Sequence, residues 1–263
     1  MKLLVVEGNT KETRKIREEF GIKPYNEIFV EMLCFLEPNV QVDVAFPTES
    51  DRDLPSIEQL QSYAGVLITG SSLSVLDNTS EVTNQLGFID LVFSSGVPIY
   101  GSCWGLQVAT VVAGGKVAKS NNGLELGVSK PITLTKEGEQ SAFFNRTQSF
   151  ESLCIHYDEI SIAPKDAIVL ATNEHSAVQA MQFDYKNSSF FGVQYHPEFT
   201  PIVMAKVIRF LKDDLIFKGH YSDSAKAQEE ISVLESKNLA TEIINYKLHT
   251  QEIKNWLNSI VKN

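Results

Sequence analysis

Residues 97–107 read VPIYGSCWGLQ and predict a buried strand, a sharp turn and the start of a helix. Cys103 stands at the turn between Gly101 and Gly105, in the pattern Gly-x-Cys-x-Gly, which is the cysteine form of a nucleophile elbow. The reacting atom must project from a tight turn, and strand and helix can approach closely only where side chains are missing. The helix dipole favours a thiolate there, and the backbone N–H of Trp104 would face a developing oxyanion. The pattern alone also allows a buried, inert cysteine.

A candidate base lies in residues 191–199, which read FGVQYHPEF. The apolar run predicts a strand that ends at His196, and Pro197 keeps that residue extended. In an extended segment His196 and Glu198 project to the same side, so the carboxylate can orient the imidazole. The second ring nitrogen is then free to take the thiol proton. His156, with polar neighbours, is the runner-up base, and the other histidines are interpreted as surface or hydrogen-bonded structural residues.

Short apolar runs alternate with helical patterns on both sides of the elbow. Strands are expected at residues 3–6, 40–46, 65–68 and 97–100, and helices at 25–36, 56–63, 79–93 and 106–113. Such alternation is typical of parallel strands covered by helices on both faces. Beyond residue 115 the expected elements are mainly strands, at 132–135, 168–170, 178–181 and 190–194, which favours a mixed extension of the sheet. The predicted fold class is α/β, with three layers around a mostly parallel or mixed sheet.

The last segment, residues 222–261, combines dense charge with apolar residues at helical spacing. This pattern predicts one or two amphipathic helices. We therefore divide the chain into a domain of residues 1–218, closed by a helix at 201–211, and a C-terminal helical appendage of residues 219–263. The favoured interpretation is that the apolar face of the appendage packs on its own domain. The alternative is a contact with a partner or with a second copy in a homodimer.

Composition excludes several classes of function. The chain has 263 residues and a formal net charge of −10, with no cluster of Lys and Arg, so nucleic acid is not an expected partner. Three widely spaced cysteines fit neither a disulfide framework nor zinc ligands, so we expect a reducing compartment, no metal and no cofactor. No apolar stretch approaches the ~18 residues of a membrane span, and the N-terminus lacks a signal-peptide pattern. We expect a cytoplasmic protein that binds no membrane.

Two motifs carry a resemblance to a known family. Gly101 to Gln107 and His196-Pro197-Glu198 together resemble the class I, triad-type glutamine amidotransferases, which pair an elbow of the form Gly-x-Cys-x-Gly-x-Gln with a later His-Pro-Glu. By this resemblance Cys103 is the nucleophile, His196 the base and Glu198 its orienter. The resemblance also implies that Gln107 contacts the bound substrate.

A third segment, residues 67–72, is similar to the family loop that supplies the second oxyanion N–H, here from Gly70 or Ser71. Ser71 and Ser72 depart from the usual glycine-glycine-proline form of that loop. Further stretches at 125–127, 156–159 and 178–180 are similar to stand-alone proteins related to the glutaminase domain of GMP synthetase. The resemblance covers residues 1–212.

The resemblance implies that Cys103 attacks the side-chain amide of L-glutamine, releases ammonia and forms a thioester that water hydrolyses. A separate synthetase chain would then be the partner that accepts the ammonia. One alternative is a γ-glutamyl peptidase or hydrolase, which uses the same triad on a larger γ-glutamyl amide without a partner. The other is a catalytically inactive binding module of the same fold.

Overall fold

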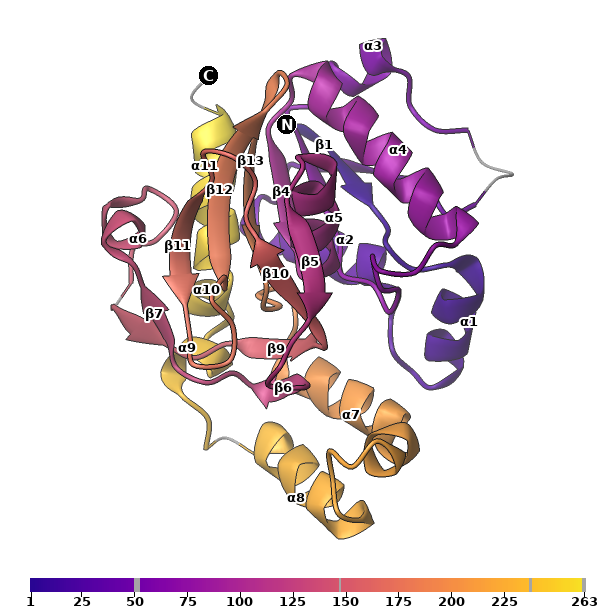
Figure 1. Ribbon diagram of the computed structural model, residues 1–263, viewed down its shortest axis with the longest axis vertical. Helices are drawn as coiled ribbons and strands as arrows, with labels where there is room; N and C mark the ends of the chain where they lie inside the picture. The colour runs from indigo at the N-terminus through magenta and orange to yellow at the C-terminus, as the bar shows by residue number, and fades with distance from the viewer. Residues whose placement is uncertain (50–52, 147, 237, 262–263) are drawn as a thin grey trace.

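The computed structural model describes residues 1–49, 53–146, 148–236 and 238–261 (Figure 1). The strands are β1 (Lys2–Val6), β2 (Gln41–Ala45), β3 (Gly65–Ile68), β4 (Ile99–Ser102), β5 (Lys116–Lys119), β6 (Glu125–Val128), β7 (Ile132–Leu134), β8 (Ser149–Phe150), β9 (Leu153–His156), β10 (Asp158–Ile162), β11 (Ile168–Thr172), β12 (Ala180–Tyr185) and β13 (Ser188–Val193). The helices are α1 (Lys11–Glu19), α2 (Tyr25–Leu36), α3 (Ile57–Leu60), α4 (Ser80–Ser95), α5 (Trp104–Val112), α6 (Lys136–Gln140), α7 (Pro201–Phe217), α8 (Ser224–Glu235), α9 (Thr241–Ile244), α10 (Tyr246–His249) and α11 (Gln251–Val261).

Nine of the described strands form one mixed sheet, in the order β2-β1-β3-β4-β13-β12-β11-β7-β8. The neighbours from β2 to β13 pair in parallel. The neighbours from β13 to β8 pair antiparallel. The buried runs expected at 3–6, 65–68 and 97–100 lie in the parallel half, and the predicted mixed extension is the antiparallel half. The α/β fold class is confirmed.

Helices cover both faces of this sheet, as Figure 1 shows for α4 and α5 on one side and α2 and α11 on the other. Side chains alternate along a strand, so each strand feeds two cores. On β1, Leu4 and Val6 belong to the core beneath α4 and α5, whereas Leu3 and Val5 belong to the core beneath α2 and α11. The two cores fix the strand ends, including the end of β4 where the elbow begins.

A third apolar core lies at one end of the sheet, where α7 and α8 run side by side (Figure 1). It includes Tyr25 from α2, Leu153 from β9 and Phe199 from the segment after β13. These residues bring the start of α2 and the strand-end segments together. The closing helix expected at 201–211 extends to Phe217.

Helix α1 and several short strands were not expected from the sequence. Helix α1 reads KETRKIREE, with a single large apolar residue, Ile16, which is itself exposed, so no apolar stripe indicates the helix. Strands β5, β6, β9 and β10 are four or five residues long and form two separate two-stranded sheets. Such short segments carry too little periodicity to distinguish a strand from a loop by sequence alone.

The predicted C-terminal appendage contains four helices in its described part, rather than one or two. The extra break falls at Asn245, whose side chain accepts the backbone N–H of Lys247 and so starts a new helix. Helix α11 buries Ile253, Trp256, Leu257 and Ile260 in the same core as α2. The apolar face of the appendage therefore packs on its own domain, as expected. The domain boundary at 218/219 and a homodimer both stay predictions.

Candidate active site

The turn after β4 has the geometry of a nucleophile elbow. Cys103 has φ 50° and ψ −102°, a left-handed conformation that is rare for a residue with a side chain, and it directly precedes α5. A Cβ on Gly101 would lie 2.6 Å from the carbonyl carbon of Gly105, and one on Gly105 would lie 2.5 Å from the carbonyl oxygen of Ile68. Gly101 lets β4 approach α5, and Gly105 lets α5 approach the end of β3, closely enough to hold the strained turn.

His196 and Glu198 lie just beyond β13, the parallel neighbour of β4. The His196 Nδ1 and Glu198 Oε1 atoms are 2.6 Å apart, and both side chains are almost completely buried. The second carboxylate oxygen, Oε2, accepts a hydrogen bond of 3.0 Å from the Ser102 hydroxyl, next to Cys103. The carboxylate is thereby fixed from two sides, and it fixes the imidazole in turn.

The imidazole faces the cysteine. Burial lowers the pKa of His196, but the Glu198 carboxylate and the nearby Cys103 sulfur outweigh burial and raise that pKa well above its ordinary value. The ring stacks on Phe199, with centroids 4.2 Å apart and planes 12° apart. Cys103 is 6% exposed, and its thiol donates to the Ile155 carbonyl oxygen at 3.6 Å. Cys103 and His196 therefore border the same cavity.

The loop after β3 places Gly70 directly against this imidazole. A Cβ on Gly70 would lie 2.7 Å from His196 Cε1, so any other residue would displace the ring. Ser71 and Ser72, where this loop departs from the family's glycine-glycine-proline form, make hydrogen bonds to the turn after β1. The Ser71 hydroxyl donates to the Gly8 carbonyl oxygen at 2.8 Å, and the Ser72 N–H donates to Asn9 Oδ1 at 2.9 Å. The two serines tie the loop to the turn after β1, and this holds the loop in place without the proline.

The remaining predicted substrate contacts lie on α5. The N–H of Trp104 is the first of the helix and has no helical carbonyl to bond, so it is available to a ligand. Its indole donates to Gln85 Oε1 at 3.0 Å and anchors the helix start. The Gln107 amide donates to the Asp158 carbonyl oxygen at 3.0 Å and borders the same cavity as Cys103.

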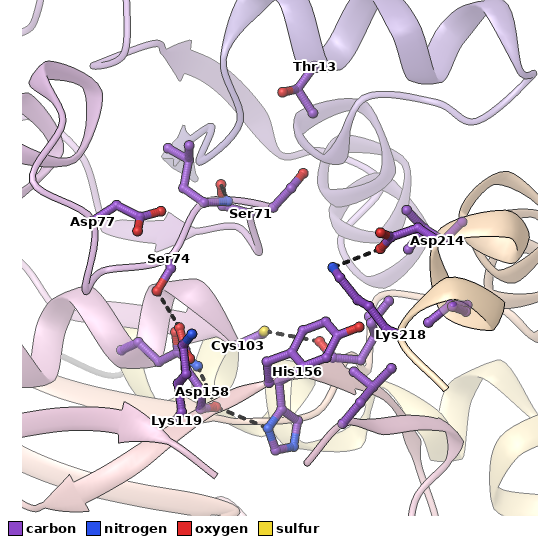
Figure 2. A pocket seen from close by; sticks show the side chains of 18 of the residues that line it. Thr13, Ser71, Ser74, Asp77, Cys103, Lys119, His156, Asp158, Asp214 and Lys218 are labelled. Carbon is purple, nitrogen blue, oxygen red and sulfur yellow. Dashed lines mark hydrogen bonds and ion pairs between the residues drawn. The ribbon is translucent and has the colours of Figure 1, made fainter. Parts of the chain in front are cut away.

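This cavity has a volume of about 820 Å³. Figure 2 shows Cys103 and Ser71 on its wall, and His156 and Asp158 on one side. Asp214 from α7 and Lys218, which directly follows α7, lie on another side (Figure 2). Its lining also includes an apolar group from α1, α7 and neighbouring loops, namely Ile16, Leu76, Leu124, Phe210, Leu211 and Leu215. Drug-sized ligands occupy cavities of about 300–1,000 Å³, so the space suits a substrate with a sizeable organic leaving group.

The runner-up base, His156, is buried and engaged at both nitrogens. Its Nε2 pairs with Glu125 Oε2 at 2.9 Å, and its Nδ1 lies 3.1 Å from the Asp158 carbonyl oxygen. Gln179 donates to the same Glu125 oxygen at 2.9 Å. This network fixes the strand ends behind the cavity and leaves His156 no nitrogen for a thiol proton.

Several residues at the site were missed by the sequence analysis. Arg17 and Tyr25 line the cavity beside His196. Tyr246 donates to the Glu198 carbonyl oxygen at 3.0 Å, and His249 Nε2 lies 3.3 Å from the His196 carbonyl oxygen. These contacts bring α1 and the appendage to the site from far along the chain, so no local pattern could indicate them.

Within the described ranges, no group of three potential ligand side chains is arranged to hold a metal ion. No helix in that part of the chain is both long and apolar enough to cross a membrane.

Comparison with known proteins identifies the family. The class I glutamine amidotransferase family model matches residues 27–213. A γ-glutamyl-L-1-hydroxyisopropylamide hydrolase of Pseudomonas is 30% identical, over 99% of this chain and 93% of its own length. One of the subunits of a glutamine-hydrolysing GMP synthase from Sulfolobus acidocaldarius is 33% identical, over 54% of this chain and 71% of its own length. A glutamine amidotransferase structure from Thermotoga maritima superposes with a TM-score of 0.71 at 18% identity, covering 100% of this chain and 99% of that one.

The chain belongs to the class I glutamine amidotransferase family and is a hydrolytic enzyme of that family. The resemblance stated from the two motifs is confirmed, including the relationship to GMP synthase subunits.

Proposed function

We propose that this enzyme hydrolyses the γ-carboxamide bond of glutamine or of a γ-glutamyl amide through a thioester on Cys103. One observation carries the proposal: Cys103 and His196 line one cavity, and Glu198 Oε1 lies 2.6 Å from Nδ1 of the imidazole. A nucleophile, a base and an orienting carboxylate in this order form the arrangement that activates a thiol.

In the first half-reaction Cys103 gives its thiol proton to His196, and the sulfur attacks the γ-carbonyl carbon and forms a C–S bond. The N–H groups of Trp104 and of Gly70 or Ser71 stabilise the oxyanion. Collapse of this tetrahedral intermediate breaks the C–N bond, and the protonated His196 gives its proton to the departing nitrogen. In the second half-reaction His196 takes a proton from water, the hydroxide attacks the thioester, and glutamate leaves as the thiol is restored.

A substituted γ-glutamyl amide is favoured over glutamine as the substrate. The cavity of about 820 Å³ is large for a reaction that releases only ammonia. The Pseudomonas hydrolase, whose name gives it a γ-glutamyl amide as substrate, matches almost the entire chain. Such an enzyme needs no second protein.

Glutamine hydrolysis coupled to a separate synthetase is the second candidate. The similarity to the Sulfolobus GMP synthase chain favours it, although that match covers about half of this chain. The similarity to a hydrolase over almost the entire chain argues against the inactive binding module. The homodimer and the cytoplasmic location stay predictions.

The purified chain tests the proposal when it is incubated alone with glutamine and with γ-glutamyl alkylamides while glutamate release is measured. We expect turnover of the alkylamides without any added protein. Cys103→Ser and His196→Asn should each lower kcat/KM by about 10⁴-fold or more. Cys34→Ser, which removes an exposed thiol, is the matched control and should keep full activity. Turnover only after a second protein is added would favour the synthetase-coupled candidate.

A further inference from the structure

Arg17 is a buried cation with free hydrogen-bond donors on the wall of the cavity. It is 4% exposed and lies on α1, outside the segment that matches the family model. Among the described residues, its Nε and Nη1 atoms have no hydrogen-bond partner, and its guanidinium pairs with no carboxylate. Only Nη2 is bonded, to the Ser72 hydroxyl at 3.2 Å.

The buried Arg17 guanidinium has more hydrogen-bond donors than the described residues satisfy. Burying a charge is costly unless it is paired and hydrogen-bonded. The Tyr25 ring lies under the Arg17 guanidinium, with 4.5 Å between the ring centroid and Cζ, which offsets part of that cost. The fork of N–H donors suits a carboxylate, and a ligand in the cavity can supply the partner that the described residues do not.

The position of Arg17 indicates which part of a substrate it meets. The Tyr25 ring lies against the Arg17 guanidinium, and its centroid is 6.3 Å from the centroid of the His196 ring. His196 must reach the departing nitrogen to protonate it, so the leaving amine lies on this side of Cys103. Together, the 4.5 Å and 6.3 Å distances from the Tyr25 centroid place the Arg17 guanidinium no more than about 11 Å from the His196 ring. An extended residue spans about 3.5 Å, so one or two residues attached to that nitrogen, with hydrogen-bond contacts of about 3 Å at either end, can reach the guanidinium.

We propose that Arg17 binds a carboxylate on the leaving amine, so that the preferred substrates are γ-glutamyl amino acids or γ-glutamyl dipeptides. This assignment rests on the proposed function and makes it more specific. Arg17 contacts the substrate and determines its specificity, but it takes no part in the bond changes at Cys103.

The test compares acids with their own amides, because the two differ only in the carboxylate. The pairs are γ-glutamylalanine with γ-glutamylalaninamide, and γ-glutamylalanylglycine with its C-terminal amide. We expect the wild-type enzyme to prefer the acid in at least one pair by about tenfold or more in kcat/KM. Arg17→Gln should lower that acid-to-amide ratio about tenfold to hundredfold, mainly through KM for the acid. Arg17→Lys, which keeps the charge but not the fork, should lower it less.

Arg14→Gln is the matched control. Arg14 is buried on the same helix but bonds Glu49 and the Asn9 carbonyl, and it does not line the cavity. This variant should lower stability and leave the acid-to-amide ratio unchanged. Two results would overturn the role of Arg17 and leave γ-glutamyl hydrolysis standing. One is a wild-type enzyme that prefers neither acid over its amide. The other is an Arg17→Gln variant whose kcat/KM falls equally for the acid and for the amide. An enzyme that cleaves none of these compounds and no glutamine would instead refute the proposed function.

Discussion

The phenol of Tyr246 donates a hydrogen bond to the backbone carbonyl of Glu198, with 3.0 Å between the oxygens. Tyr246 begins α10 in the C-terminal appendage, and Glu198 orients the imidazole of His196. His249, at the end of the same short helix, bonds the His196 carbonyl. The appendage therefore holds the backbone of both residues, and we infer that it positions them.

Tyr246→Phe should lower kcat by up to about tenfold and stability by about 1 kcal/mol, because the lost hydrogen bond lets the Glu198 backbone shift. Tyr221→Phe removes another appendage phenol, which bonds Glu230 away from the site, and serves as the control. Parallel kinetics and thermal unfolding of the two variants distinguish positioning from stability alone. Equal losses of kcat in both would contradict a positioning role for Tyr246.

Gly70→Ala should lower kcat/KM by about a hundredfold or more, because the new Cβ would lie 2.7 Å from a ring that Phe199 holds in place. Gly87→Ala, within α4 and facing open space, is the matched control. It should keep full activity and gain about 0.5–1 kcal/mol of stability from helix propensity. Normal kcat/KM in Gly70→Ala would contradict this prediction, because the His196 ring could then be displaced without loss of activity.

Glu198→Gln should lower kcat/KM by about 10²–10⁴-fold, which is less than the loss expected for Cys103→Ser or His196→Asn. The amide keeps the shape of the carboxylate but removes one of the charges that raise the pKa of His196. The pKa of His196 should therefore fall, and the alkaline limb of the kcat/KM profile should move to lower pH. NMR titration of the His196 ring measures the pKa directly, and an unchanged value would rule out this role for Glu198.

His249 should make the fold sensitive to acid. Burial, reinforced by the Arg146 cation, lowers the pKa of His249 to about 4 from an ordinary 6.5. Between these values the unfolded chain binds a proton that the folded chain does not, so stability is full above about pH 6.5 and falls as the pH drops toward 4. The contribution amounts to about 3 kcal/mol at most.

Urea unfolding at pH 7 and pH 4.5 measures this effect. His249→Gln should flatten the pH dependence, whereas His220→Gln, at an exposed histidine, should leave it as in the wild type. If His249→Gln lost as much unfolding free energy between pH 7 and pH 4.5 as the wild type does, His249 would not be the source of the acid sensitivity.

Sequence patterns located the residues of the elbow and of the His-Pro-Glu segment because each lies at the end of a buried strand, where a local motif is readable. The geometry brings Cys103, His196 and Glu198 together because β4 and β13 are parallel neighbours. Arg17 could not be located in this way, since α1 has no apolar stripe. The anchoring of Ser72 by Asn9, 63 residues away, is likewise a tertiary contact without a local signal.

Whether Cys103 forms the covalent intermediate is tested directly by mass spectrometry of the enzyme quenched in acid during turnover of a γ-glutamyl amide. We expect a γ-glutamyl thioester on the peptide that contains Cys103, present in Cys34→Ser and absent from Cys103→Ser. An adduct on any other residue, or continued turnover by Cys103→Ser, would contradict this role of Cys103.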